Sequence, residues 1–406
     1  MWSWGVNDEG ALGRPARSTN TQLLGAGVGT AGVPEDEPGR VALPAGPGDG
    51  APARLSAGDS HTLCVTTGGA VFGWGAFRSS GGLFGFVPGA AASKTAPAPV
   101  RVFPPAAGPH AGERATQVAS GADHALCCTA AGLVFSWGCA ERGRLGRLPA
   151  AAADVPEKKL DAALKTRMLT PGRVELPGGA RARGVAAGLF FSFALGAEGA
   201  AEGAPGGGAA AVWGWGLNNY GQLTLADDRG LNAHYAPQRL AAAERLPGGG
   251  LAAVAGGEHH ALYLSRAGRL FAAGRPTYGR LGRADVDAAS DAFVADLRPV
   301  DGLPDPAGPG GRVTAAAAGL ATSGCTTADG AAFFWGYGTM NQLGKRDDED
   351  EPLPRRMAPA PKALRGRPVT QLSFGGQHAA LLADPGPGGD SEPAATNGGG
   401  KRRRAG

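Results

Sequence analysis

Residues 121–138 read GADHALCCTAAGLVFSWG, and the same succession of features returns along the whole chain. A glycine and a histidine open an apolar run, a short turn that contains glycine follows, and a second apolar run ends in Trp-Gly. Internal repeats have to be recognised before any other feature, because they decide the architecture. The chain is therefore expected to consist of one small unit that is repeated several times.

Two sequence anchors alternate along the chain. All seven tryptophans stand in apolar stretches that end in glycine, and a degenerate copy adds one more, so that the anchors fall at Gly5, Gly75, Gly138, Gly216, Gly274 and Gly336. The other anchor opens an apolar run, as in Gly58-Asp-Ser-His61, Gly121-Ala-Asp-His124, Gly257-Glu-His-His260 and Gly375-Gly-Gln-His378. Gly188 and Gly319 open equivalent runs without the histidine. A leucine, commonly followed by glycine, comes seven residues after several Trp-Gly anchors.

Short apolar runs that are separated by turn residues at regular spacing predict an all-β protein. A unit of four strands that is repeated six times predicts a β-propeller. We expect the propeller to cover residues 1–384, followed by a Gly/Pro-rich linker and a basic tail over residues 385–406. The tryptophans are expected to pack between neighbouring blades, and the glycines to lie where backbones approach closely.

Composition and motifs exclude several classes of protein. The chain has 406 residues and a net charge of +4, and its apolar stretches are far shorter than the ~20 residues that cross a bilayer. Five cysteines without a C-x-x-C pair, and a first segment unlike a signal peptide, predict an intracellular protein with reduced thiols. Metal-ligand spacings, a nucleophile elbow and a dinucleotide fingerprint are all missing, so no cofactor and no covalent catalysis are expected.

The repeats resemble those of the regulator of chromosome condensation family. The motifs that carry the resemblance are Asn7-Asp-Glu-Gly-Ala-Leu-Gly-Arg14, Gly58-Asp-Ser-His-Thr62, Trp74-Gly-Ala-Phe-Arg78, the segments 138–147, 216–220 and 274–282, and Gly375-Gly-Gln-His378. The resemblance implies a propeller, with seven blades as the family norm, that acts as a nucleotide exchange factor for the small GTPase Ran. Residues 7–10 resemble the family's second repeat, so the first repeat is expected to be lacking. Pairing of residues 2–5 with residues 376–382 is one way to close the ring, with the number of blades left open.

The resemblance also implies which residues act on the GTPase. The matching positions are Asp59, Asp123, Arg147 and His259, together with a protruding β-wedge made of Phe77, Arg78, Ser79, Ser80, Gly81 and Gly82. Local turn capping is the alternative role for the two aspartates. Serines stand at 79 and 80 where the family has acidic and amide residues, which predicts a weaker contact. The motif histidines are expected to hydrogen-bond the backbone of a neighbouring blade, whereas His259 is an additional histidine beside one of them.

The implied partners are Ran and the nucleosome, and the implied setting is a monomer on chromatin in the nucleus, away from membranes. The tail residues Lys401, Arg402, Arg403 and Arg404 would serve nuclear import or contact DNA phosphates, unless they form an inert solvated terminus. A basic stretch over residues 148–183 would dock on histones or form an ordinary solvated loop. The alternative function is a propeller that acts as an interaction scaffold, for example one associated with a ligase, without exchange activity.

Overall fold

The structure is a computed structural model of the 406-residue chain. It describes residues 1–3, 9–14, 16–17, 33–34, 39–88, 94–197, 210–226, 232–339, 341–345, 347–357, 367–375 and 379–384. Strands dominate this part of the chain and the helices in it are few and short. Not one of those helices has the length and apolar character that crossing a bilayer requires.

Five antiparallel sheets of four strands each form the body of the protein. They consist of β5 (Pro52–Ala57), β6 (His61–Thr66), β7 (Val71–Gly75) and β10 (Ala96–Phe103); β11 (Ala115–Ser120), β12 (His124–Thr129), β13 (Val134–Gly138) and β14 (Gly172–Val174); β15 (Ala182–Ala187), β16 (Phe191–Gly196), β17 (Val212–Leu217) and β18 (Ala233–Arg239); β19 (Leu251–Gly256), β20 (His260–Ser265), β21 (Leu270–Gly274) and β22 (Arg298–Pro299); β23 (Val313–Ala318), β24 (Thr322–Thr327), β25 (Ala332–Gly336) and β26 (Glu351–Arg356). In each sheet a glycine anchor lies between the first and second strands, and the third strand carries a Trp-Gly anchor or its degenerate copy at or next to its last residue. The predicted all-β propeller is confirmed.

The remaining elements are shorter. Two-stranded sheets pair β1 (Trp2–Ser3) with β4 (Gly39–Arg40), β2 (Ala16–Arg17) with β3 (Val33–Pro34), β8 (Phe77–Ser79) with β9 (Gly82–Gly85), and β27 (Val369–Phe374) with β28 (Ala379–Ala383). The helices are α1 (Ala150–Ala153), α2 (Ala162–Leu169) and α3 (Ala241–Glu244), with 3-10 turns η1 (Glu141–Gly143), η2 (Glu157–Lys159), η3 (Pro177–Gly179) and η4 (Thr277–Gly279).

The pairing of the end strands differs from the expectation. β1 pairs with β4 and β28 pairs with β27, so residues 2–3 and 379–382 do not make the pairing that was considered as one way to close the ring. Residues 4–5 and 376–378 lie outside the described residues. Five repeats therefore form complete sheets and the sixth contributes two strands. β1 and β4 lie against the first complete sheet instead, where Met1 and Val41 pack around Trp74. That local packing takes the place of the end-to-end pairing.

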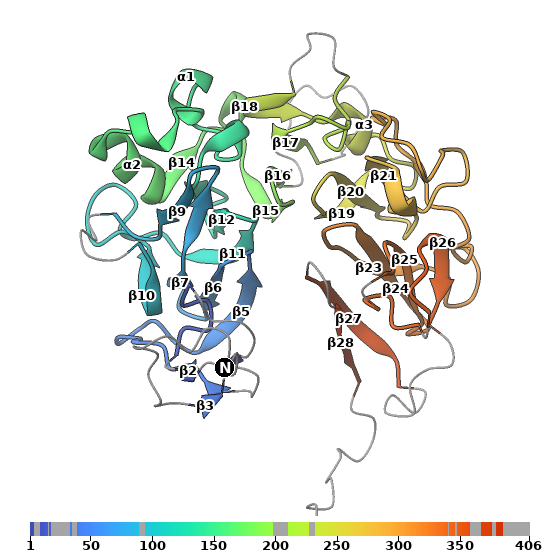
Figure 1. The fold of residues 1–406 in the computed structure, drawn as a ribbon, viewed down its shortest axis with the longest axis horizontal. Coiled ribbons are helices and arrows are strands. Elements are labelled where there is room, and N and C mark those ends of the chain that lie inside the picture. The colour runs from blue at the N-terminus through green and yellow to red at the C-terminus, as the bar shows by residue number, and fades with distance from the viewer. Residues whose placement is uncertain are drawn as a thin grey trace, which may run out of the picture.

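The sheets follow one another in chain order around a common centre (Figure 1), and the first strand of each sheet lies nearest that centre. A cavity of about 230 Å³ at the centre is lined by the glycines that open the second strands, among them Gly58, Gly121, Gly188 and Gly319. The chain can reverse this close to the centre because these positions carry no Cβ: one added at Gly121 would lie 2.0 Å from the ring of His124.

The seam between sheets is built around buried tryptophans. Three of them donate the indole N–H to a backbone carbonyl of the preceding repeat: Trp74 to Ala11 (2.7 Å), Trp215 to Arg144 (3.0 Å) and Trp335 to Arg280 (3.0 Å). Two residues after each carbonyl, a glycine with φ of +63° to +65° lies flat on the same indole: Gly13, Gly146 and Gly282. A Cβ there would come within 2.6–2.8 Å of the ring, which explains the recurrent Leu-Gly. The prediction that tryptophan packs between blades is confirmed.

A serine completes two of these seams. The Ser192 hydroxyl donates to the carbonyl of Arg144 (3.0 Å) and lies 2.8 Å from Nε2 of His124, so the imidazole donates to the serine oxygen. His260, Ser323 and the carbonyl of Arg280 repeat this arrangement. At His124 and His260 the bond across the seam goes to a serine side chain. The expected backbone partner in the next repeat is present as well, since the backbone of Ala122 acts on His61 and that of Thr322 on His260, and both favour the charged imidazole. His61 faces no such serine, and burial lowers its pKa to about 3.

Removing the seam serine should destabilise the fold. We expect Ser192→Ala and Ser323→Ala each to lower the free energy of unfolding by about 1 to 3 kcal/mol, because a buried imidazole nitrogen and a carbonyl oxygen lose their partner. Denaturant unfolding of the purified variants measures the change, with Ser60→Ala as the control. Unfolding midpoints equal to that of the wild type for both variants would contradict the role assigned to the serine.

Candidate functional site

One face of the propeller collects most of the predicted site. In every complete sheet the start of the second strand pairs with the end of the third, as in His61–Gly75, His124–Gly138 and His260–Gly274. The turns before the second strand and the loops after the third strand therefore emerge at the same end of each sheet. We call this end the wedge face, because the β8–β9 hairpin also projects from it. Asp59, Asp123 and His259 all lie on its turns.

Asp123 is a largely buried carboxylate at the root of the hairpin. Its Oδ1 accepts a hydrogen bond from the backbone N–H of Arg78 (2.7 Å), its Oδ2 lies 3.8 Å from the Arg144 guanidinium, and its side chain is 13% exposed. Burial raises its pKa to about 6, although both of those partners favour the charged form. Asp59, which is exposed, lies near enough for its charge to raise the same pKa. The structure thus brings the two predicted aspartates together.

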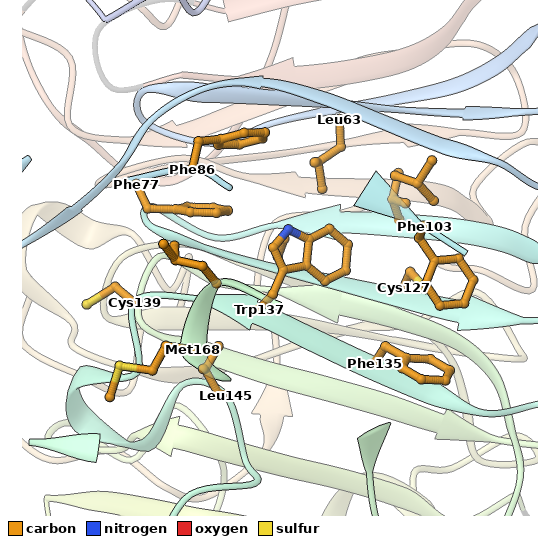
Figure 2. Close-up of a cluster of buried hydrophobic side chains, with 14 of the residues drawn as sticks. Leu63, Phe77, Phe86, Phe103, Cys127, Phe135, Trp137, Cys139, Leu145 and Met168 are labelled. Carbon is orange, nitrogen blue, oxygen red and sulfur yellow. The ribbon is translucent and has the colours of Figure 1, made fainter. Parts of the chain in front are cut away.

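The hairpin is anchored in the core through its first residue. Phe77 is fully buried and stacks on Phe86, with the ring centroids 5.1 Å apart. Figure 2 shows the Phe86 ring above the Phe77 ring, with Trp137 beside them, within the cluster that fills the seam between the first two complete sheets. Phe77 was predicted as part of the protruding wedge, and the structure places it at the buried root. Arg78 is exposed, and its guanidinium pairs with the Glu9 carboxylate.

Carboxylates from other segments hold the tip of the hairpin. Ser79 Oγ donates to Glu157 (2.7 Å), and both the N–H and the Oγ of Ser80 donate to Glu141 (3.0 and 2.7 Å). Glu157 in η2 is in turn approached by Lys165 (3.7 Å). The two serines, which depart from the family pattern, are therefore used within the chain to fix the tip. Gly81 and Gly82 form its turn.

Arg147 lies apart from the aspartates. Its Nε donates to the carbonyl of Ser136 (3.2 Å), and a terminal nitrogen donates to the carbonyls of Arg167 and Thr170 at the end of α2 (2.8 and 3.1 Å). Burial lowers its pKa to about 10. Arg14 and Arg283 occupy the same place in their repeats and likewise donate to backbone carbonyls. In the structure Arg147 fastens a loop to a helix end.

The arginine that does reach Asp123 is Arg144, which the sequence reasoning missed. Its side chain is only 5% exposed, its Nε donates to the carbonyl of Glu141 (2.8 Å), and its guanidinium lies 5.0 Å from the centre of the Phe190 ring. The available signal was the Gly-Arg-Leu-Gly sequence at 143–146 and again at 279–282, whose arginine precedes the leucine of each seam.

His259 belongs to an aromatic extension of this cluster. Its ring lies 5.0 Å from Tyr220 and 6.1 Å from Phe190. Burial and, to a smaller extent, the charges of Arg280 and Arg275 lower its pKa to about 4, so the imidazole is neutral at pH 7. Asp123, Arg144, Phe190 and His259 therefore form one continuous band across two seams.

The described part of the chain has no group of three residues that could hold a metal ion. All five cysteines are free and buried. His378 and the tail residues 401–404 lie outside the described residues.

The comparisons with known proteins place the chain in a family. A model of the RCC1-like domain matches residues 1–381. The chain belongs to the RCC1-like family. The human regulator of chromosome condensation is 32% identical over 387 residues, which cover 94% of this chain and 78% of the relative. A budding-yeast protein named guanine nucleotide exchange factor SRM1 is 27% identical, over 86% of this chain and 68% of its own length.

A solved structure shows the same fold. The crystal structure of Prp20p from Saccharomyces cerevisiae, described with its binding to Gsp1p and histones, superposes with a TM-score of 0.71 at 26% identity, over 94% of this chain and 78% of that one. The repeated sheets and the family membership thus agree with the resemblance read from the sequence motifs.

The raised pKa of Asp123 has a consequence for stability. A carboxyl whose folded pKa lies above its unfolded value stabilises the fold while it is protonated, and that stability is lost as the pH rises through about 6. Asp123→Asn removes the charge and keeps an oxygen for the Arg78 N–H. At pH 7.5 we expect it to be more stable than the wild type by about 1 to 3 kcal/mol, with no difference near pH 4.

Denaturant unfolding at both pH values measures this. The control is Asp329→Asn on the opposite face, where a hydrogen bond from Thr327 lowers the pKa of the carboxyl and no gain is expected. An Asp123→Asn variant less stable than the wild type at pH 7.5 would mean that the charged carboxylate stabilises the fold, and would contradict a raised pKa at this position.

Proposed function

We propose that the chain is a guanine-nucleotide exchange factor for the small GTPase Ran, acting on chromatin to generate Ran-GTP for nuclear transport and mitosis. The observation that carries the proposal is the largely buried Asp123 carboxylate at the root of an anchored, protruding hairpin. An ionisable group kept at a cost in stability is typical of functional sites. Membership of a family that contains a protein named as an exchange factor supports the same function.

Exchange needs no covalent chemistry. A protein that binds the nucleotide-free GTPase more tightly than the loaded form weakens nucleotide binding by the same factor, because the two sites are thermodynamically linked. In this proposal the hairpin enters the nucleotide region of Ran. Asp123 and Asp59 offer alternative partners to basic groups that hold the phosphates. The neutral ring of His259 adds a contact that needs no counter-charge.

The rigidity of the hairpin fits this task. A wedge can displace the loops of a partner only if its own conformation is rigid. Phe77 is buried in the seam cluster, and Asp123, Glu141 and Glu157 hold three successive residues after it. These carboxylates come from three separate segments, so a force on the tip spreads over much of the second sheet and its connections.

Chromatin contact is assigned to positive charge in the long connection between β13 and β14 and in the tail. Lys158 and Lys159 in η2 and Arg167 in α2 are exposed, and they lie within the predicted basic stretch. We assign them to histone or DNA contact, and the tail residues 401–404 to nuclear import or DNA. A solved relative described with histone binding supports the assignment.

The central residues can be tested by exchange kinetics. Asp123→Ala and His259→Ala should each slow the release of fluorescent GDP from Ran at least about tenfold, equivalent to ~1.4 kcal/mol in the barrier. Asp329→Ala on the opposite face is the matched control and should behave as the wild type. Circular dichroism of each variant tests whether it is folded. Arg147→Ala should instead lower the melting temperature, because the Arg147 guanidinium donates hydrogen bonds to backbone carbonyls.

A hairpin deletion separates exchange from scaffolding. Removing residues 78–82 and joining Phe77 to Leu83 through a two-residue turn leaves Phe77 and Phe86 in the core. The variant should fold and should no longer stimulate GDP release. A wild-type protein without any effect on Ran would instead favour the interaction scaffold, and an active deletion variant would remove the wedge from the mechanism.

A further inference from the structure

Two loops on the wedge face share an unusual backbone. Arg142 in η1 has φ of +59° and Tyr278 in η4 has φ of +65°, and each is followed by a glycine, Gly143 or Gly279, that is also left-handed. The two residues hold the same position in their repeats, one before the Gly-Arg-Leu-Gly sequence. Bulky residues in this region cost of order 1–2 kcal/mol each, whereas glycine has no such cost.

Each loop is locked on both sides. The nearly buried Arg144 and Arg280 donate Nε–H to the carbonyl that precedes the left-handed residue, at Glu141 (2.8 Å) and Thr277 (2.9 Å). The glycines press on the outer strand of the next sheet, since an added Cβ would lie 2.6 Å from the His234 carbonyl oxygen or 2.2 Å from Cα of Pro352. The left-handed conformation is therefore imposed by the packing around the loop.

The locked loops direct two large side chains outward. Arg142 is exposed, and Tyr278 is 40% exposed while one side of its ring rests on Tyr337, with the ring centroids 4.9 Å apart. Neither exposed part contributes to the core. Glycine at 142 would remove the cost of the left-handed conformation and keep the backbone bond to Asp154, so the bulky residue calls for another role there. At Tyr278 the contacts with Tyr337 and with the Arg280 guanidinium (5.4 Å) offset part of the cost, and the exposed part of the ring is left for a partner.

We infer that Arg142 and Tyr278 are contact residues of the wedge face for the GTPase, an assignment that rests on the proposed exchange function. Arginine and tyrosine dominate the binding energy of many protein interfaces. The locked loops lower the entropy lost on binding, because the side chains are already presented. Arg142 lies beside the Asp123 end of the band and suits an acidic group of the partner. Tyr278 lies beside the His259 end and suits an apolar or cationic one.

Glycine variants should weaken binding to Ran without lowering the stability at Arg142. Arg142→Gly and Tyr278→Gly should bind nucleotide-free Ran at least about fivefold more weakly, the loss typical of an interface contact, while the free energy of unfolding of Arg142→Gly is unchanged or higher. Surface plasmon resonance measures the affinity. The control is Thr224→Gly, which relieves a left-handed residue (φ +57°) in the loop between the two and should leave the affinity unchanged.

Asparagine variants distinguish contact from loop shape, because asparagine tolerates the left-handed region. Arg142→Asn and Tyr278→Asn should bind as weakly as the glycine variants, whereas recovery of wild-type affinity would show that only the loop conformation matters and would overturn the inference. Wild-type affinity in the glycine variants would overturn it as well, with the exchange function intact. If the wild-type protein does not bind Ran, the proposed function fails, and this assignment fails with it.

Discussion

The fold depends most on an interaction that recurs at three seams, the hydrogen bond from a buried indole N–H to a carbonyl two residues before a left-handed glycine in the preceding repeat. At Trp215 and Trp335 the same carbonyl also accepts a serine hydroxyl that is bonded to a histidine. The bond needs a glycine flat against the ring and a leucine between glycine and carbonyl. This requirement explains why Leu-Gly and Trp-Gly recur along the sequence.

The same residues link the fold to the candidate site. The carbonyl of Arg144 receives the seam bonds, while its guanidinium lies against Asp123 and Phe190 and closes the η1 loop. Arg280 does the equivalent in the η4 loop beside His259. A displacement of the site therefore strains a seam, which keeps the face preorganised. Keeping the Asp123 carboxylate in this largely buried position costs stability, and the cost is visible in its raised pKa.

The sequence predicted the architecture because the spacing of anchors directly reflects the seam. It also predicted that Asp59, Asp123 and His259 would lie on turns of one face, since they precede motif positions that all begin second strands. It failed where partners are decided only in three dimensions. Arg144 and Arg147 stand three residues apart in one loop, and only the folded geometry sends the first to Asp123 and the second to the end of α2.

Other misses have the same origin. No partners within the chain were predicted for Ser79 and Ser80, yet Glu157 and Glu141 reach them from segments more than 60 residues away. The expected pairing of the end strands followed from the repeat alone. The observed pairing of β1 with β4 depends on local packing against Trp74, which the repeat pattern does not encode.

Hydrogen–deuterium exchange of the full chain with and without nucleotide-free Ran tests most directly whether one preorganised face carries the function. We predict slower amide exchange on binding in residues 77–85, 121–124, 141–146 and 257–260, and no change in the turns of the opposite face at residues 66–70, 129–133 and 327–331. Protection confined to the opposite face, or to the outer strands alone, would contradict a functional wedge face.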